Sequence, residues 1–123
     1  MSAGLRDLRR LGLALLNEGV INGKRLFPAE VVRKIRKGGD PEKFGTAYPA
    51  LVGGSYARMW WKYPGEDGIF AAGGVHGQTI YVDPSTEMVI VRFASFPRAE
   101  NSLIDPTSLP AFRAVADYLK AKG

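Results

Sequence analysis

The stretch Ala71-Ala72-Gly73-Gly74-Val75-His76-Gly77-Gln78 runs directly into Thr79-Ile80-Tyr81-Val82-Asp83-Pro84, a segment predicted to be a β-strand. Three glycines within five positions remove side chains where a second backbone or a ligand comes close, and they permit backbone angles that other residues resist. His76 is the single histidine of the chain, and histidine is a residue type that often serves as an acid–base group in functional sites. The stretch is therefore the candidate functional site. The structural alternative is a β-bulge beside a histidine that only packs in the core.

The composition predicts one globular domain over residues 1–123. Hydrophobic residues make up 46% and charged residues 24% of the chain, which argues against disorder. No apolar run approaches the about 20 residues that a bilayer crossing requires, so no membrane partner is expected. The chain has no cysteine, which excludes disulfides, thiolate metal sites and cysteine nucleophiles.

The formal net charge of +5 is unevenly distributed. Residues 1–39 hold nine Lys and Arg against three Asp and Glu, whereas residues 40–123 hold eight against nine. The basic cluster at residues 33–37 is interleaved with Val32 and Ile35 as in the solvated face of an amphipathic helix, and this reading is favoured over a nucleic-acid contact.

The arginine-rich start of the chain imitates a signal peptide. Three arginines precede the apolar run 11–16, but Asn17 and Glu18 follow where the small residues of a cleavage site belong. An amphipathic helix, capped by Ser2 and closed by Gly19, explains the segment better. Localisation stays open, and a cytoplasmic one is favoured because no signal peptide is evident.

The remaining pattern predicts an α+β fold. A two-stranded ribbon around Asn22-Gly23 and a second helix from Pro28 follow the first helix, and a helix capped by Thr107 or Ser108 ends the chain. Between them lies an antiparallel sheet meander of three to four strands, packed against the N-terminal and C-terminal helices. Its strands are expected at residues 56–63, 69–72, 78–82 and 88–94.

Four stretches together resemble a known family: residues 6–19, residues 22–28, Met59-Trp60-Trp61, and residues 74–84. They are similar to the C-terminal portion of β-lactamase-fold serine hydrolases, relatives of class C β-lactamases and penicillin-binding esterases. The branch that they resemble most is the 6-aminohexanoate-dimer hydrolases. The resemblance implies a partial β-lactamase-like fold and a serine amidase or esterase acting on acyl amides or esters.

The resemblance also implies roles for the glycine-rich stretch. Ala72-Gly73-Gly74 corresponds to a Lys-Thr-Gly-type triplet on a sheet strand, so the backbone N–H of Val75 becomes an oxyanion-hole donor. Ala72 replaces the lysine of that triplet, which removes a cationic contact with a substrate carboxylate. The implied catalytic residues are Val75, through its backbone, and Gly74. The implied substrate-binding residues are Ala72, Gly73, His76, Gln78 and Trp60.

The sequence leaves two interpretations open for His76 and for the two tryptophans. His76 either contacts substrate or is a packed, hydrogen-bonded residue without a function. Trp60 and Trp61 point to opposite faces of a regular strand, so one is expected in the core and the other in the wall of a pocket.

The family's nucleophile and base are missing from these 123 residues. None of the six serines is followed by lysine three positions later, and no tyrosine begins the family's second motif. The chain is therefore expected to be inactive alone, with a small acyl substrate as its partner only when the missing N-terminal segment is present. One histidine builds no zinc site and the glycines do not form a dinucleotide motif, so neither a metal nor a cofactor is expected. The alternative function is an interaction module that self-associates or binds a partner protein through an exposed sheet face or edge.

Overall fold

One antiparallel sheet organises the chain in the computed structural model, which describes residues 3–123. Its five strands are adjacent in the order in which they occur in the sequence. They are β3 (Ser55–Ala57), β4 (Trp60–Lys62), β5 (Phe70–Gly73), β6 (Thr79–Asp83) and β7 (Met88–Arg92). The α+β class is confirmed, with one more strand than the largest number predicted.

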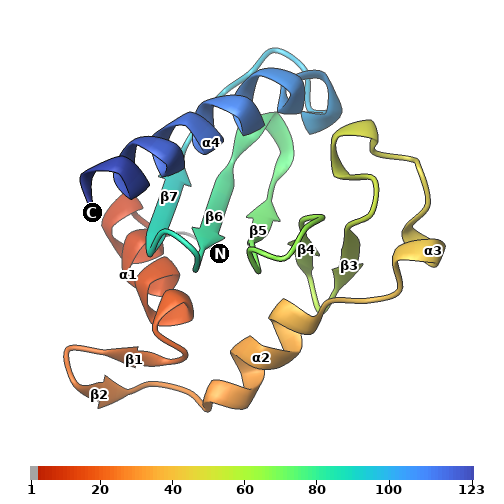
Figure 1. Ribbon diagram of the computed structural model, residues 1–123. Coiled ribbons are helices and arrows are strands. Elements are labelled where there is room, and N and C mark those ends of the chain that lie inside the picture. The colour runs from red at the N-terminus through yellow and green to blue at the C-terminus, as the bar shows by residue number, and fades with distance from the viewer. Residues whose placement is uncertain (1–2) are drawn as a thin grey trace.

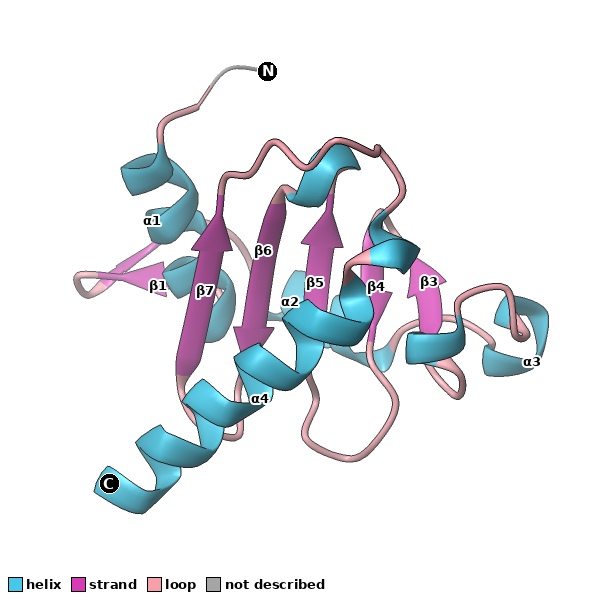
Figure 2. Cartoon of the chain, turned by 90° about the horizontal axis from the view of Figure 1, so that it is seen from above, coloured by secondary structure: helices cyan, strands magenta, loops and turns pink. Residues whose placement is uncertain are grey.

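Helices cover both faces of this sheet (Figure 1). The view from above shows α1 (Leu5–Leu16) and α2 (Ala29–Lys37) behind the sheet and α4 (Asp105–Lys122) crossing its front (Figure 2). The short helix α3 (Pro41–Phe44) lies beyond β3. A ribbon of β1 (Val20–Ile21) and β2 (Lys24–Arg25) joins α1 to α2, as the Asn22-Gly23 turn predicts.

The single strand predicted over residues 56–63 is in fact a tight hairpin. Ala57 pairs with Trp60, so only Arg58 and Met59 form the turn between β3 and β4. Both turn residues have positive φ, 54° and 71°, as a type I′ turn requires. Such turns favour Asn-Gly, and the absence of that signal made the segment read as one continuous strand.

The start of α1 also differs from its prediction. Ser2, the predicted cap, lies outside the described residues, and Gly4 directly precedes the helix. The Asp7 carboxylate accepts a hydrogen bond from the Gly4 N–H at 3.1 Å, which satisfies one amide at the helix N-terminus. Ala14 and Leu15 then carry the buried face of α1 against the sheet.

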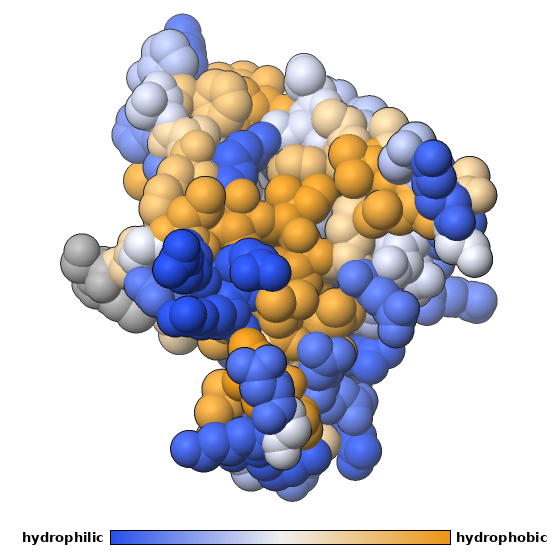
Figure 3. Space-filling model, turned by 90° about the vertical axis from the view of Figure 1, so that its left-hand side faces the viewer, coloured by the Kyte–Doolittle hydropathy of each residue, from blue (hydrophilic) through white to orange (hydrophobic). Residues whose placement is uncertain are grey.

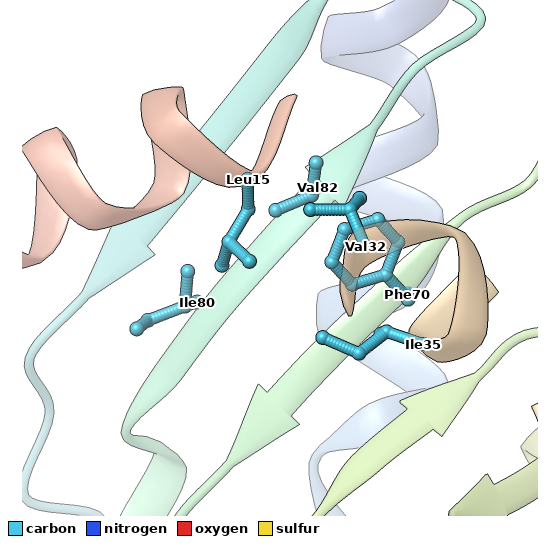
Figure 4. Packing of buried hydrophobic residues seen from close by; sticks show 6 residues of the cluster. All are labelled: Leu15, Val32, Ile35, Phe70, Ile80 and Val82. Carbon is cyan, nitrogen blue, oxygen red and sulfur yellow. The ribbon is translucent and has the colours of Figure 1, made fainter. Parts of the chain in front are cut away.

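Two apolar cores lie on opposite faces of the sheet. The core on the α1 and α2 side contains six buried side chains that point toward one another from α1, α2, β5 and β6 (Figure 4): Leu15, Val32, Ile35, Phe70, Ile80 and Val82. The core on the α4 side contains Ile69, Ala71, Tyr81, Met88, Phe112 and Ala116. Phe70 and Val82 are fully buried, and each contributes on the order of 2 kcal/mol through burial. Between residues 3 and 123, no helix combines the length and apolar character that a membrane crossing demands.

Candidate functional site

The glycine-rich stretch forms one wall of a cavity at an end of the sheet. Strand β5 ends at Gly73, a 3₁₀ turn spans Val75–Gly77, and β6 begins at Thr79. The cavity has a volume of about 450 Å³. The loop before α4 and aromatic side chains from β4 and from residues 48 and 63 form its other walls. Its lining includes Tyr48, Leu51, Trp61, Tyr63, Gly73, Gly74, Val75, Glu100, Asn101 and Asp105.

Val75 has the one backbone amide of this turn that stays unpaired. The amide of Gly74 donates to the Gln78 carbonyl at 2.8 Å, and that of His76 donates to the Ala99 carbonyl at 3.1 Å. No hydrogen bond among residues 3–123 uses the Val75 amide, and the residue is 63% exposed on the cavity wall. A backbone N–H without an internal partner beside a cavity is available to a ligand oxygen.

Asn101 holds the turn from both ends. Its Nδ2 donates to the Gly74 carbonyl at 2.8 Å, and its Oδ1 accepts from the Gly77 N–H at 3.1 Å. The two bonds fix the residues on either side of Val75 and leave the Val75 amide between them. Asn101 was not among the predicted site residues, because no local pattern links it to a turn more than 20 residues away.

Arg92, also missed, ties the turn to α4. Its Nε donates to the Gly77 carbonyl at 2.8 Å, and its NH1 donates to Ser108 Oγ at 2.7 Å. The guanidinium lies over the rings of Phe96 and Phe112, 5.4 Å and 5.2 Å from their centroids. Arg92 thus joins β7, the glycine-rich turn and the first half of α4.

Four of the five predicted substrate-binding residues lie outside the cavity lining, namely Ala72, His76, Gln78 and Trp60. Ala72 packs in the core beneath α1 and α2. The ring Nδ1 of His76 lies 2.7 Å from the Phe96 carbonyl and donates to it, in line with the packed reading of this residue. The Gln78 side chain pairs with the backbone of Ala94, accepting from its N–H at 3.2 Å and donating to its carbonyl. Gly73, Gly74 and Val75 remain as the predicted residues on the cavity wall.

One tryptophan lies in the core and the other on the cavity wall, but the cavity residue is Trp61 and not Trp60, the predicted substrate-binding residue. Trp60 packs edge-on against Phe70, 5.5 Å between centroids, in the core on the α1 and α2 side. Trp61 lines the cavity and contacts three other rings, those of Phe44, Tyr48 and Tyr56. The two tryptophans were expected on opposite faces of the strand. Which of them faces the cavity depends on how β4 pairs with β5, and this pairing could not be read from the sequence. Trp61 pairs with Ala71, whose side chain faces α4.

The cavity is acidic and partly shielded from water. Burial raises the pKa of the half-buried Asp105 carboxyl, against the opposing influence of Arg92. Burial, followed by the nearby Asp105 charge, raises the pKa of Tyr63 well above its usual range, so Tyr63 stays a neutral phenol. The cavity thus offers an aromatic wall, a backbone donor and a phenol. No group of three potential metal ligands occurs among residues 3–123.

Comparisons with known proteins find similarity to hydrolases in sequence and in fold. Over 102 residues the chain is 37% identical to the 6-aminohexanoate-dimer hydrolase of Paenarthrobacter ureafaciens, a match covering 79% of this chain and 25% of that protein. A solved structure from Bacillus anthracis, provisionally named a 6-aminohexanoate-dimer hydrolase, matches with a TM-score of 0.75 and 31% identity. This second match covers 97% of the chain and 30% of the other protein. No family model matches the chain.

These similarities confirm the resemblance to the 6-aminohexanoate-dimer hydrolases and fit a C-terminal portion of that family. The chain spans less than a third of the length of either relative, since it covers 25% of one and 30% of the other. The activity of a whole hydrolase is therefore only a proposal for this chain.

Proposed function

We propose that this chain supplies one wall of the acyl-transfer site of a serine amidase or esterase, with the Val75 amide as an oxyanion donor. The observation that carries the proposal is the unpaired Val75 amide beside a cavity, between neighbours whose amides are already bonded. The identity of 37% to a 6-aminohexanoate-dimer hydrolase supports an acyl amide or ester as the substrate class.

The chemistry follows from the position of that amide. When a serine oxygen attacks an acyl carbonyl, the carbonyl oxygen gains negative charge, and a fixed N–H aimed at it stabilises the tetrahedral intermediate. Gly73 and Gly74 lack Cβ atoms, so the acyl group approaches the strand end closely. Trp61 and Tyr48, whose ring centroids are 4.9 Å apart, offer the apolar surface for its chain.

The 123-residue chain should be inactive alone, because it contains neither the Ser-x-x-Lys motif nor the tyrosine motif that the resemblance implies. The purified chain is incubated with a p-nitrophenyl ester and with the 6-aminohexanoate dimer, and product is measured against buffer. Both rates should equal the buffer rate. Turnover by the pure chain would contradict the inactivity.

The donor role is tested in a complete hydrolase whose matching segment is replaced by this chain. Val75→Pro removes the N–H that follows Gly74, whose extended backbone (φ −105°, ψ 168°) is compatible with a proline after it, and Val75→Ala is the matched control that keeps the N–H. Loss of one oxyanion donor should lower kcat by about 10²–10³-fold in the proline variant only. Equal rates for the two variants would refute the role. If the exchanged protein does not fold, the same pair of substitutions is made at the matching position of the relative.

A further inference from the structure

The peptide unit that carries the Val75 amide is held at its other end by Asn101. The Gly74 carbonyl and the Val75 N–H belong to this one unit, which is planar and trans, so the two groups point in opposite directions. Asn101 Nδ2 donates to the Gly74 carbonyl at 2.8 Å. A restraint on the carbonyl therefore also sets the direction in which the Val75 N–H points.

The sequence around this peptide unit gives such a restraint its importance. Gly73 and Gly74 precede Val75, and glycine has more backbone freedom than any other residue. The Gly74 N–H donates to the Gln78 carbonyl at 2.8 Å, but that N–H belongs to the preceding peptide unit. The donor on Asn101 acts on the next unit, where the direction of the Val75 N–H is decided.

Asn101 is itself fixed in orientation. Its Oδ1 accepts from the Gly77 N–H at 3.1 Å. Because a backbone carbonyl only accepts and a backbone N–H only donates, the two ends of the Asn101 amide cannot exchange places. The segment before it is attached to the same turn, since the His76 N–H donates to the Ala99 carbonyl at 3.1 Å. Asn101 also begins the 3₁₀ helix Asn101–Leu103 that leads into α4, so its side chain is a preorganised donor.

The same hydrogen bond strengthens the Val75 N–H as a donor. When a peptide carbonyl accepts a hydrogen bond, the peptide unit becomes more polarised and its N–H donates more strongly, which is the cooperative effect of hydrogen-bond chains. In the proposed site the chain runs from Asn101 Nδ2 through the Gly74–Val75 peptide unit to the oxyanion. This strengthening counts most where negative charge develops, so it favours the transition state over the bound substrate.

We infer that Asn101 is a positioning residue that aims and polarises the Val75 N–H through its hydrogen bond to the Gly74 carbonyl. The inference rests on the proposed acyl-transfer function and names the residue that controls its donor. Removal of the Asn101 amide should therefore lower kcat and leave KM unchanged, because the lost stabilisation belongs to the transition state. A direct contact between substrate and Asn101, which also lines the cavity, would instead raise KM.

The kinetic test uses the complete hydrolase in which this chain replaces the matching segment. Asn101→Leu nearly keeps the size of the side chain and removes both of its hydrogen bonds. It should lower kcat about tenfold without a change in KM. Leu103→Ala is the control on the same 3₁₀ helix, because Leu103 is 54% exposed and lies outside the cavity lining. The control should leave both constants unchanged.

A double-mutant cycle separates positioning from structural support. Val75→Pro removes the N–H, so adding Asn101→Leu to it should not lower kcat any further. A further loss of about tenfold in that background would overturn the inference, because Asn101 would then act independently of the Val75 amide. An unchanged kcat or a raised KM in Asn101→Leu alone would also overturn it. Equal rates for Val75→Pro and Val75→Ala would instead refute the oxyanion role itself.

A measurement on the 123-residue chain needs no activity. The NMR order parameter of the Val75 N–H should fall from about 0.85, the value of rigid backbone, toward about 0.6 in Asn101→Leu and stay high in Leu103→Ala. An unchanged order parameter in Asn101→Leu would overturn the positioning role, even when the exchanged hydrolase does not fold. Figure 3 shows a broad apolar surface on the side of the molecule that carries α1. Because such surfaces favour association, the relaxation data are compared at two protein concentrations.

Discussion

At the scale of single residues, the glycine-rich turn leaves no room for a side chain at Gly77. It has φ of +92°, and a Cβ there would overlap the ring of Phe96. Gly77→Ala should therefore lower the free energy of unfolding by about 3 kcal/mol or more in urea denaturation. Gly23→Ala is the control, because φ of +75° strains it similarly while no atom lies within 4 Å; about 1 kcal/mol is expected. Equal losses would show that the Phe96 contact does not matter.

Asp105 is a single residue that makes the free energy of unfolding depend on pH. Burial raises its pKa in the folded state, so the protonated form favours folding. This contribution is complete below the ordinary pKa of about 3.9 and is lost as the pH rises through the folded pKa. Relative to Asp105→Asn, the unmodified chain should thus lose stability between about pH 4 and neutrality, measured by urea denaturation at a series of pH values. The favourable placement of a carboxylate in the first turn of α4 opposes this trend, and a reversed trend would mean that the helix dipole dominates.

At the scale of elements, the β3–β4 hairpin carries a turn that its own residues disfavour. Arg58 and Met59 both adopt positive φ, a conformation that Asn and Gly accept far more readily. The double change Arg58→Asn with Met59→Gly should stabilise the chain by about 1 kcal/mol, measured by thermal or urea denaturation. Met59 is 80% exposed, so its loss removes little packing. Destabilisation would show that these side chains make contributions beyond the turn.

The same hairpin shows what the sequence was able to predict. The β1–β2 ribbon was predicted because Asn22-Gly23 encodes its turn locally, whereas nothing in Arg58-Met59 signals a reversal. The helix faces followed from their periodicity, and the glycine-rich strand end lines a cavity, while its role in a site stays a prediction. Asn101 and Arg92, which hold that strand end in place, were missed because their partners lie far away in sequence. The choice between Trp60 and Trp61 depended on which face of the sheet α4 covers.

At the scale of the whole molecule, a single sheet separates two cores that share its strands. Phe70 contributes to the core under α1 and α2, and its neighbour Ala71 contributes to the core under α4. Any loss of pairing between β5 and β6 therefore disturbs both cores together, which favours one cooperative unit. The single domain predicted over residues 1–123 stays a prediction until the two faces are unfolded with separate probes.

The two tryptophans provide those probes, because Trp60 lies in one core and Trp61 lies on the α4 side of the sheet. Trp60→Phe and Trp61→Phe each leave one tryptophan as a fluorescent reporter. The unfolding of each variant in urea is followed by the tryptophan that remains. Phe112→Leu, which trims the α4 core, should then cost about 1–2 kcal/mol with either reporter. Trp60, on the opposite face of the sheet from Phe112, should report the same loss of unfolding free energy as Trp61, because β5 and β6 contribute to both cores. A shift seen only by Trp61 would mean that α4 and its core unfold as a separate unit.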